Sequence, residues 1–312
     1  MAEPHAAETG HADARSETAR GGARRAGPER EAAWGTKDDL LSRFILATNS
    51  DTGKVDYKYL RDIILNIVMA GKDTTAGALA WFLYMMCKHP EVQEKISKEA
   101  ADAGEATSSI DDFSRSLTDE ALNKMHYLHA ALTETLRLYP SLPLDNKECF
   151  SDDVLPNGYS VGKGDIVFYA PYAMGRMERL WGEDAVVFQP ERWLDERGEF
   201  LPESPFKFTA FQAGPRICLG KEFAYRQMKI FAAVLLLFFV LELRDKDAGV
   251  NYRTMITLLR LRPEASCSHL CTQDTRNVSS TDASGVGCGC PLLVIAGSSA
   301  FCGHLRHSDT VR

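Results

Sequence analysis

The sequence predicts a mainly α-helical protein with minor β-structure. Apolar residues recur with helical spacing through the middle of the chain, and the predicted helices are much longer than the few strand-like segments. The 312 residues are 45% hydrophobic, which is enough for one large core or two modest ones.

The composition divides the chain into three parts. Residues 1–36 are rich in Ala, Gly and Arg, and we expect them to be disordered because they can bury little apolar surface. Residues 263–312 carry five of the eight cysteines and long Ser/Thr/Gly-rich stretches, so they predict an irregular Cys-rich tail. The part between them, residues 37–262, has the composition of a globular domain.

The longest predicted helix covers about residues 57–88. His89-Pro90 ends it, because proline lacks a backbone donor and disfavours helical geometry in the residue before it. A second helix, about 91–103, follows this turn. The apolar positions of the long helix follow the i, i+3, i+4 spacing of one face: Leu60, Ile63, Ile64, Ile67, Ala78, Phe82 and Met86.

Further elements follow in the second half of the chain. Thr118 and the two acids after it supply capping chemistry for a helix through Leu138, and a strand is predicted at 165–169. A last helix covers about 221–241. Its apolar run, 230–241, has 12 residues, whereas a membrane-spanning helix needs about 20, so it predicts a buried helix and no membrane span.

The charge balance argues against nucleic-acid partners. There are 36 Lys and Arg against 43 Asp and Glu, so the net charge of −7 provides no global basic field. The N-terminus has no apolar leader, from which we expect an intracellular, reducing setting. In that setting the cysteines are free thiols, metal ligands or incidental residues rather than a disulfide framework.

A cysteine between two glycines is the first candidate site. Cys218 follows Gly214, precedes Gly220, and lies directly before the predicted helix at 221. Free backbone N–H groups and the positive end of a helix dipole favour a thiolate there, which suits a metal-bound sulfur. The glycines allow close approach of a flat ligand, and Arg216 can pair with a carboxylate on it. The alternative is a buried structural cysteine in a Gly-rich turn.

Residues 211–220 resemble the haem-ligand signature of the cytochrome P450 family, Phe-x-x-Gly-x-Arg-x-Cys-x-Gly. All five fixed positions match: Phe211, Gly214, Arg216, Cys218 and Gly220. The resemblance implies a haem b cofactor bound by these residues, with Cys218 as the axial ligand of its iron. It also implies the C-terminal half of the cytochrome P450 fold, with residues 37–262 as a partial haem-thiolate monooxygenase domain.

A carboxylate and a guanidinium one helical turn apart form the second candidate group. By spacing alone, Glu134 and Arg137 predict a solvated pair worth about 0.2 to 0.5 kcal/mol. The resemblance implies instead a buried structural network with Arg192, which stands in a Pro-Glu-Arg-Trp segment.

The third group, residues 70–75, lies inside the long predicted helix. A glycine there costs about 1 kcal/mol, and the neighbouring Asp and Thr compete for backbone hydrogen bonds, so we expect a local opening of the helix. The alternative is an exposed polar turn. The resemblance implies that Asp73 and Thr74 help to move protons to bound dioxygen. It also implies that Ala70, Leu142 and Leu144 line the substrate pocket.

Cysteines and histidines of the tail are the fourth group. A zinc site requires ligand pairs on an ordered scaffold, and the Ser/Gly-rich tail favours incidental cysteines instead. These residues are Cys267, His269, Cys271, Cys288, Cys290, Cys302 and His304.

Within the family, the sequence is most similar to plant-type fatty-acid ω-hydroxylases. The segments that carry this likeness are 134–140, 145–147, 171–176 and 220–228. The implied reaction is insertion of one oxygen atom from O2 into a fatty-acid C–H bond. Electrons would come from NADPH through an NADPH-cytochrome reductase, at the endoplasmic reticulum membrane.

The sequence also departs from the family. A complete member is longer on its N-terminal side, where it carries a membrane anchor, substrate-gating helices and a helix that grips a haem propionate. Beyond Leu261 the Cys-rich tail replaces the closing β-hairpin of the family. The second hypothesis is therefore a truncated, catalytically silent fragment or binding module, soluble and intracellular, without the N-terminal half of the haem pocket.

Overall fold

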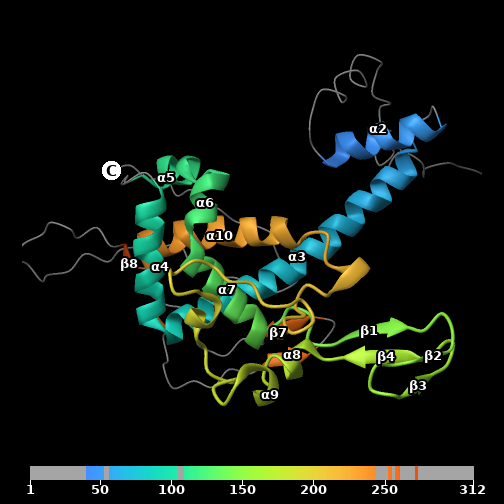
Figure 1. The fold of residues 1–312 in the computed structure, drawn as a ribbon. Helices are drawn as coiled ribbons and strands as arrows, with labels where there is room; N and C mark the ends of the chain where they lie inside the picture. Colours follow the sequence, from blue (N-terminus) through green and yellow to red (C-terminus); the bar gives the residue numbers. More distant parts are fainter. Residues whose placement is uncertain are drawn as a thin grey trace, which may run out of the picture. The chain divides into compact units, whose positions relative to one another are not determined.

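The computed structural model describes residues 40–52, 56–104, 109–243, 252–254, 257–260 and 271–272. The segment predicted to be disordered, 1–36, lies outside them, as does the tail apart from residues 271–272. The chain forms two units, Met1–Ile67 and Val68–Arg312. The described part is mostly helical with four small sheets, which confirms the predicted mainly α class with minor β (Figure 1).

The first unit contains α2 (Leu40–Thr52) and the start of α3 (Tyr57–Lys88). The sequence analysis did not predict α2. The Asp56 side chain caps α3, because Oδ1 accepts hydrogen bonds from the backbone N–H groups of Lys58 (2.9 Å) and Tyr59 (3.1 Å).

Helix α3 continues without interruption into the second unit and has the predicted bounds. Phe82 and Met86 are buried on its core side, whereas Ile64 and Ile67 of the predicted apolar face are exposed. The expected opening at residues 70–75 is absent, because the hydroxyl of Thr74 donates back to the carbonyl of Ala70 at 2.7 Å within a continuous helix.

Four helices follow α3: α4 (Pro90–Ala103), α5 (Ile110–Ser116), α6 (Asp119–Lys124) and α7 (His126–Leu138). The single helix predicted from Thr118 to Leu138 is wrong, because it is broken at Met125. Thr118 does cap α6, by accepting a hydrogen bond from Ala121 N at 3.2 Å.

The break at Met125 has a tertiary cause. The carboxylate of Glu99, on α4, accepts hydrogen bonds from the N–H groups of Tyr127 (2.6 Å) and Leu128 (2.7 Å) at the start of α7. A residue far away in the sequence therefore caps α7 and allows it to begin anew. Burial raises the pKa of Glu99, while these two hydrogen bonds oppose the rise.

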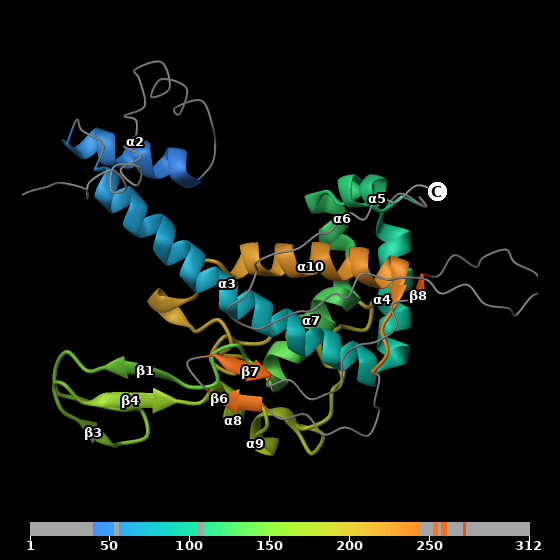
Figure 2. The same ribbon diagram turned by 180° about the vertical axis from the view of Figure 1, so that it is seen from behind.

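Residues 145–169 form an extension that we call the β-arm (Figures 1 and 2). Within it β1 (Asp145–Glu148) pairs antiparallel with β4 (Ile166–Tyr169), with Asp145 opposite Tyr169. Strand β4 corresponds to the strand predicted at 165–169. A second hairpin joins β2 (Asp153–Val154) to β3 (Ser160–Val161).

Short elements follow the β-arm and lead to the last long helix. They are α8 (Pro171–Met174), α9 (Glu178–Trp181), and the 3-10 turns η1 (Pro190–Trp193) and η2 (Gly214–Arg216). Helix α10 (Lys221–Phe238) ends three residues before the predicted bound, because the chain turns into β5 (Phe239–Val240), which pairs with β8 (Cys271–Thr272). A small hairpin of β6 (Tyr252–Thr254) and β7 (Leu258–Arg260) completes the described elements.

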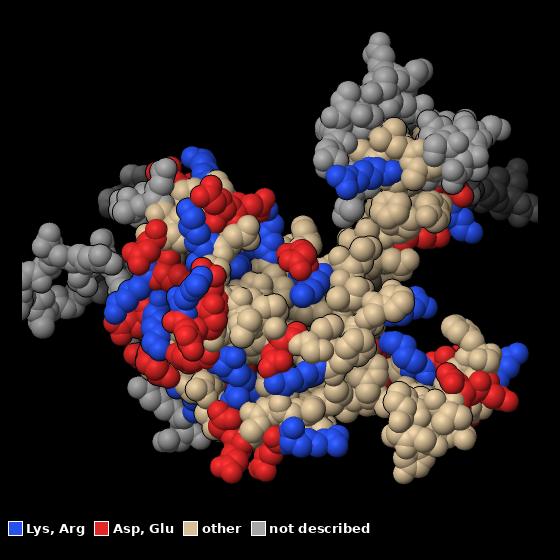
Figure 3. All heavy atoms as spheres, in the orientation of Figure 1, with Lys and Arg blue, Asp and Glu red and all other residues tan. Residues whose placement is uncertain are grey.

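The core of the second unit lies where α10 packs against α4 and α7 (Figures 1 and 2). The buried amide of Gln93 joins α4 to the residue after β5: Oε1 accepts from Leu241 N at 2.6 Å, and Nε2 donates to Leu241 O at 3.2 Å. Charged side chains of both signs gather over α4, α5 and α6 (Figure 3). In the part of the chain that the structure describes, no helix is both long and apolar enough to span a bilayer.

Candidate functional site

Two backbone hydrogen bonds within the loop that carries Cys218 hold it closed. Cys218 N donates to Phe211 O at 2.8 Å, and Ile217 N donates to Gly214 O at 3.0 Å. Two residues have left-handed backbone conformations, Gly214 with φ 66° and Gln212 with φ 62°. Gly214 adopts this conformation at no steric cost, whereas Gln212 adopts it at a steric cost because it has a Cβ atom.

Cys218 is exposed at the start of α10, so the alternative of a buried structural cysteine is wrong. Gly220 occupies the N-cap position of α10, where no side chain accepts from the first N–H groups of the helix. Lys221 N donates to Cys218 O at 3.4 Å, so the cysteine adjoins the positive end of the helix dipole.

The surface of this loop fits a flat ligand with an anionic edge. A Cβ atom at Gly214 would meet nothing within 4 Å, and at Gly220 the nearest atom is Cys218 Sγ at 4.0 Å. Arg216 is exposed and forms no ion pair with another described residue, so its guanidinium is available for a carboxylate. Leu219 is 97% exposed, which leaves apolar surface beside the thiol. The residues present therefore suit a haem group held through Cys218.

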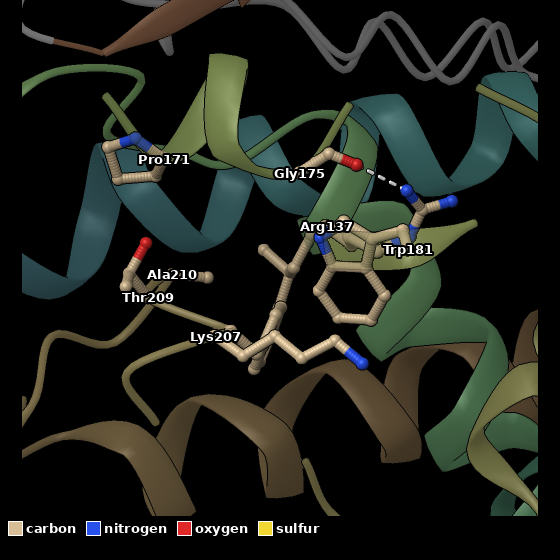
Figure 4. Close-up of a pocket in the computed structure, with 9 residues that line it drawn as sticks. Arg137, Pro171, Gly175, Trp181, Lys207, Thr209 and Ala210 are labelled. Carbon is tan, nitrogen blue, oxygen red and sulfur yellow. Dashed lines mark hydrogen bonds between the residues drawn. The ribbon is translucent and has the colours of Figure 1, made fainter. Parts of the chain in front are cut away.

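Glu134 and Arg137 are fully buried on α7 and face each other in two hydrogen bonds. Arg137 Nε donates to Glu134 Oε2, and Nη2 donates to Oε1, both at 2.7 Å. The other guanidinium N–H groups donate to the carbonyls of Gly175, Ala185 (2.5 Å) and Val187 (3.1 Å); Figure 4 shows the bond to Gly175. The solvated pair of the alternative interpretation is thus excluded.

Arg192, from η1, lies beside this pair. Its Nε is 3.6 Å from Glu134 Oε1, and its Nη2 is 2.9 Å from Asp184 Oδ2. The hydrogen bond to Arg192 lowers the pKa of the Asp184 carboxyl. The sequence analysis missed Trp193, whose indole donates to Glu134 Oε2 at 2.9 Å. Its position next to Arg192 in the Pro-Glu-Arg-Trp segment was the available signal.

A small cavity of about 10 Å³ adjoins the network. Arg137, Trp181 and Lys207 line it, with the Lys207 ammonium 4.4 Å from the Trp181 ring centroid (Figure 4). This volume has room for about one water molecule and excludes an organic substrate. The geometry therefore fits a structural role for the Glu134 network.

The segment at residues 70–75 lies beside the chain that follows α7. The hydroxyl of Ser141 donates to the carbonyl of Thr74 at 2.8 Å, a contact that the sequence analysis did not predict. Leu142 is the next residue in the chain and is partly buried. Asp73 is exposed and forms no ion pair with another described residue.

The other residues predicted to contact substrate or to move protons have few contacts with the rest of the site. Ala70 is exposed, and Leu144 is 53% exposed at the base of the β-arm. Among the described residues, no hydrogen bond connects Asp73 or Thr74 with the Cys218 loop. The structure thus joins Thr74 to the chain after α7 through Ser141, and no described hydrogen bond joins it to the Cys218 loop.

Metal ligation by other residues has no support in the described ranges, which hold no group of three or more His, Cys, Asp or Glu suited to a metal ion. The tail residues considered for zinc lie outside these ranges, apart from the backbone of Cys271 in β8.

A partly buried histidine, His129, contacts the aromatic residues that adjoin the loop. The ring of His129 stacks on Tyr225 with centroids 4.3 Å apart and contacts Phe200 at 4.1 Å, and Tyr225 in turn contacts Phe211 at 5.2 Å. Burial, followed by the nearby positive charge of Lys229, lowers the pKa of His129 to about 3.

This histidine predicts a pH dependence of stability. Below pH 6.5 His129 becomes protonated in the unfolded chain, whereas in the native protein it stays neutral down to about pH 3. The free energy of unfolding therefore falls as the pH decreases through this window. The loss at pH 5 is about 2 kcal/mol. Between pH 7.5 and pH 5, the free energy of unfolding measured in urea should fall by about 2 kcal/mol less in His129→Phe than in the unchanged protein. Equal losses in both proteins would contradict the neutral state of His129.

The described part of the chain is a mainly helical domain with an exposed cysteine loop before a long helix and a buried Glu-Arg pair. The chain belongs to the cytochrome P450 family, whose model, described as Cytochrome P450, matches residues 22–267. The membership predicted from the sequence is thereby confirmed.

Plant proteins of this family are similar to the chain. It is 57% identical to cytochrome P450 704C1 of Pinus taeda over 71% of this chain and 44% of that protein. It is 48% identical to cytochrome P450 704B1 of Arabidopsis thaliana, over 71% of this chain and 46% of that protein. For cytochrome P450 86B1 of the same plant the identity is 49%, over 64% of this chain and 36% of that protein. The chain therefore spans less than half the length of these relatives.

Proposed function

We propose that the chain is the haem-thiolate part of a monooxygenase that hydroxylates fatty acids at the ω-position. The observation that carries this proposal is the exposed Cys218 thiol, in a loop that matches the signature of the family, leaves open space over Gly214 and has only the thiol itself near Gly220. When bound, haem supplies the one-electron and dioxygen chemistry. The protein supplies ligation, orientation and protons.

Cys218 would hold the iron through its thiolate sulfur, with Phe211 fixing the loop from its other end through the bond between Phe211 O and Cys218 N. Arg216 would pair with a carboxylate of the cofactor, since its guanidinium has no ion-pair partner among the described residues. Gly214 and Gly220 would let the backbone approach the flat face of the ring.

Asp73 and Thr74 are proposed to hold and move protons. The Thr74 hydroxyl donates to Ala70 O, so the lone pairs of its oxygen remain able to accept a hydrogen bond from a water molecule. The exposed carboxylate of Asp73 is adjacent and can exchange protons with solvent. Ala70, Leu142 and Leu144 would contact the acyl chain, to which their apolar side chains are suited.

The proposal includes partners that the complete enzyme needs. An NADPH-cytochrome reductase would deliver electrons singly, O2 would be the second substrate, and the reaction would take place at the endoplasmic reticulum membrane. Support for these points comes from membership of the family.

The second candidate function is a catalytically silent fragment or binding module. One observation favours it: apolar side chains such as Met69, which is 73% exposed, lie on the surface of the described part of the chain. In this case the residues around Cys218 would bind haem weakly or not at all.

The absorption spectrum of the haem-reconstituted protein distinguishes the two. After reduction with dithionite and addition of carbon monoxide, we expect a red-shifted Soret band that disappears completely in Cys218→Ala. Cys149→Ala is the matched control, because Cys149 is also a described free thiol but lies on the β-arm, and it should keep the band. Absence of bound haem in the unchanged protein would favour the silent fragment.

A further inference from the structure

We propose that Lys147 of β1 is a positioning residue for the Cys218 loop, which it holds by fixing the side chain of Gln212. The β-arm would thus help to hold the loop that carries the thiol. The importance of this contact for catalysis rests on the function proposed above.

The contacts of Lys147 join the β-arm to the loop. Its ammonium nitrogen lies 3.0 Å from Asp145 Oδ2, 3.3 Å from Gln212 Oε1, and 5.5 Å from the ring centroid of Tyr169. The hydroxyl of Tyr169 donates to the same oxygen of Asp145. Four side chains from two paired strands and the loop thus form one connected polar group, the relay Tyr169–Asp145–Lys147–Gln212.

Gln212 is the member that needs to be held. Its φ of 62° makes it the only non-glycine residue with a left-handed backbone in the part of the chain that the structure describes. This conformation is sterically unfavourable for an L-residue and persists only where the surroundings enforce it. Gln212 N donates to Thr209 O at 3.0 Å, and Lys147 supplies the bond from another element.

The position of Gln212 gives this constraint a consequence for the thiol. Gln212 directly follows Phe211, whose carbonyl accepts a hydrogen bond from Cys218 N. The φ angle of Gln212 therefore sets the path of residues 213–218 between the two ends of this hydrogen bond. Without the Lys147 contact the turn can relax toward a right-handed conformation, and the bond between Cys218 N and Phe211 O opens more often.

Asp145 keeps Lys147 in place as a charged partner. Burial acts to raise the pKa of Asp145, but the hydrogen bonds from Tyr169 and Lys147 prevail and lower it. The ammonium group is therefore held by a carboxylate on one side and directed at the Gln212 amide on the other. A bond with a charged donor is worth more than a neutral one, which suits a contact that offsets backbone strain.

The test measures amide hydrogen exchange in the haem-free chain, resolved to the N–H groups of Ile217 and Cys218. Lys147→Met should raise both exchange rates about two- to threefold, because an opening that becomes about 0.5 kcal/mol easier is about twice as populated. Lys147→Arg should restore most of the protection. Lys163→Met, another exposed lysine on the β-arm, should change neither rate.

A double variant tests whether Lys147 acts on the loop through Gln212. Gln212→Gly removes the cost of the left-handed conformation, so Lys147→Met added to it should have little further effect on the exchange of Cys218 N–H. The N–H of Cys149, which donates to Asp165 O at 2.9 Å, reports whether the β-arm itself remains folded.

Three outcomes would overturn the proposal: unchanged exchange in Lys147→Met, an equal effect in the Gln212→Gly background, or an effect that occurs only after haem is added. The last would mean that Lys147 acts on the cofactor and not on the loop. Because the measurement needs no haem, its result is independent of the spectral test of the proposed function.

Discussion

Arg137→Met should lower the free energy of unfolding by about 3 to 5 kcal/mol. The substitution removes the partner of a fully buried carboxylate, since both side chains have no exposed surface and are joined by two bonds of 2.7 Å. It also leaves the carbonyls of Gly175, Ala185 and Val187 without their guanidinium donor. Each group that loses its partner keeps the cost of its burial.

The chain contains a matched control for this prediction. Arg115 and Asp112 have the same i, i+3 spacing, but their side chains are 78% and 64% exposed, and the closest atoms are 3.6 Å apart. Arg115→Met should therefore cost less than about 1 kcal/mol in the same urea titration. If the two variants had equal midpoints, the Glu134 network would not contribute to stability.

This comparison shows what the local sequence could and could not reveal. Both pairs have the i, i+3 spacing of a solvated helix pair, and this spacing alone does not distinguish the buried pair from the exposed one. Burial is decided by η1, which packs on α7 and brings Trp193 onto Glu134. The resemblance to the family supplied that information for Arg192, because the motif includes the distant segment.

The same distinction explains which elements were predicted. Helix α3 has its predicted bounds because a long apolar period and His89-Pro90 are both local signals. The break at Met125 depends on the carboxylate of Glu99, and the left-handed Gln212 depends on Lys147. Neither partner is adjacent in sequence, so no local pattern indicated them.

The expected opening of α3 failed for a related reason. Asp and Thr disfavour helix interiors when their side chains bond to the backbone in other conformations. Thr74 uses that capacity within the helix, on Ala70 O, and Ser141 adds a donor to its carbonyl from outside. The residues that predicted an opening are therefore compatible with a continuous helix, and their exposure fits a surface that a ligand or a partner covers.

Gly175→Ala should destabilise the protein by about 3 kcal/mol, the upper range for an added methyl group in a packed site. Gly175 has ordinary right-handed backbone angles, φ −64° and ψ −12°, so alanine causes no backbone strain there. Its Cβ would instead overlap the carbonyl oxygen of Arg137 and lie 3.3 Å from Pro171 O. Both are backbone atoms, which cannot rotate away, so α8 would have to move off α7 and weaken the bond from Arg137 to Gly175 O.

Gly71→Ala is the control with the opposite sign. Gly71 lies inside α3, is exposed, and a Cβ there would meet nothing within 4 Å. The same added methyl group should therefore stabilise the protein by about 1 kcal/mol through helix propensity. The two midpoints in urea should move in opposite directions. If Gly175→Ala were neutral, the close approach of α8 to the end of α7 would not hold, and the Arg137 guanidinium would have to find another acceptor in place of Gly175 O.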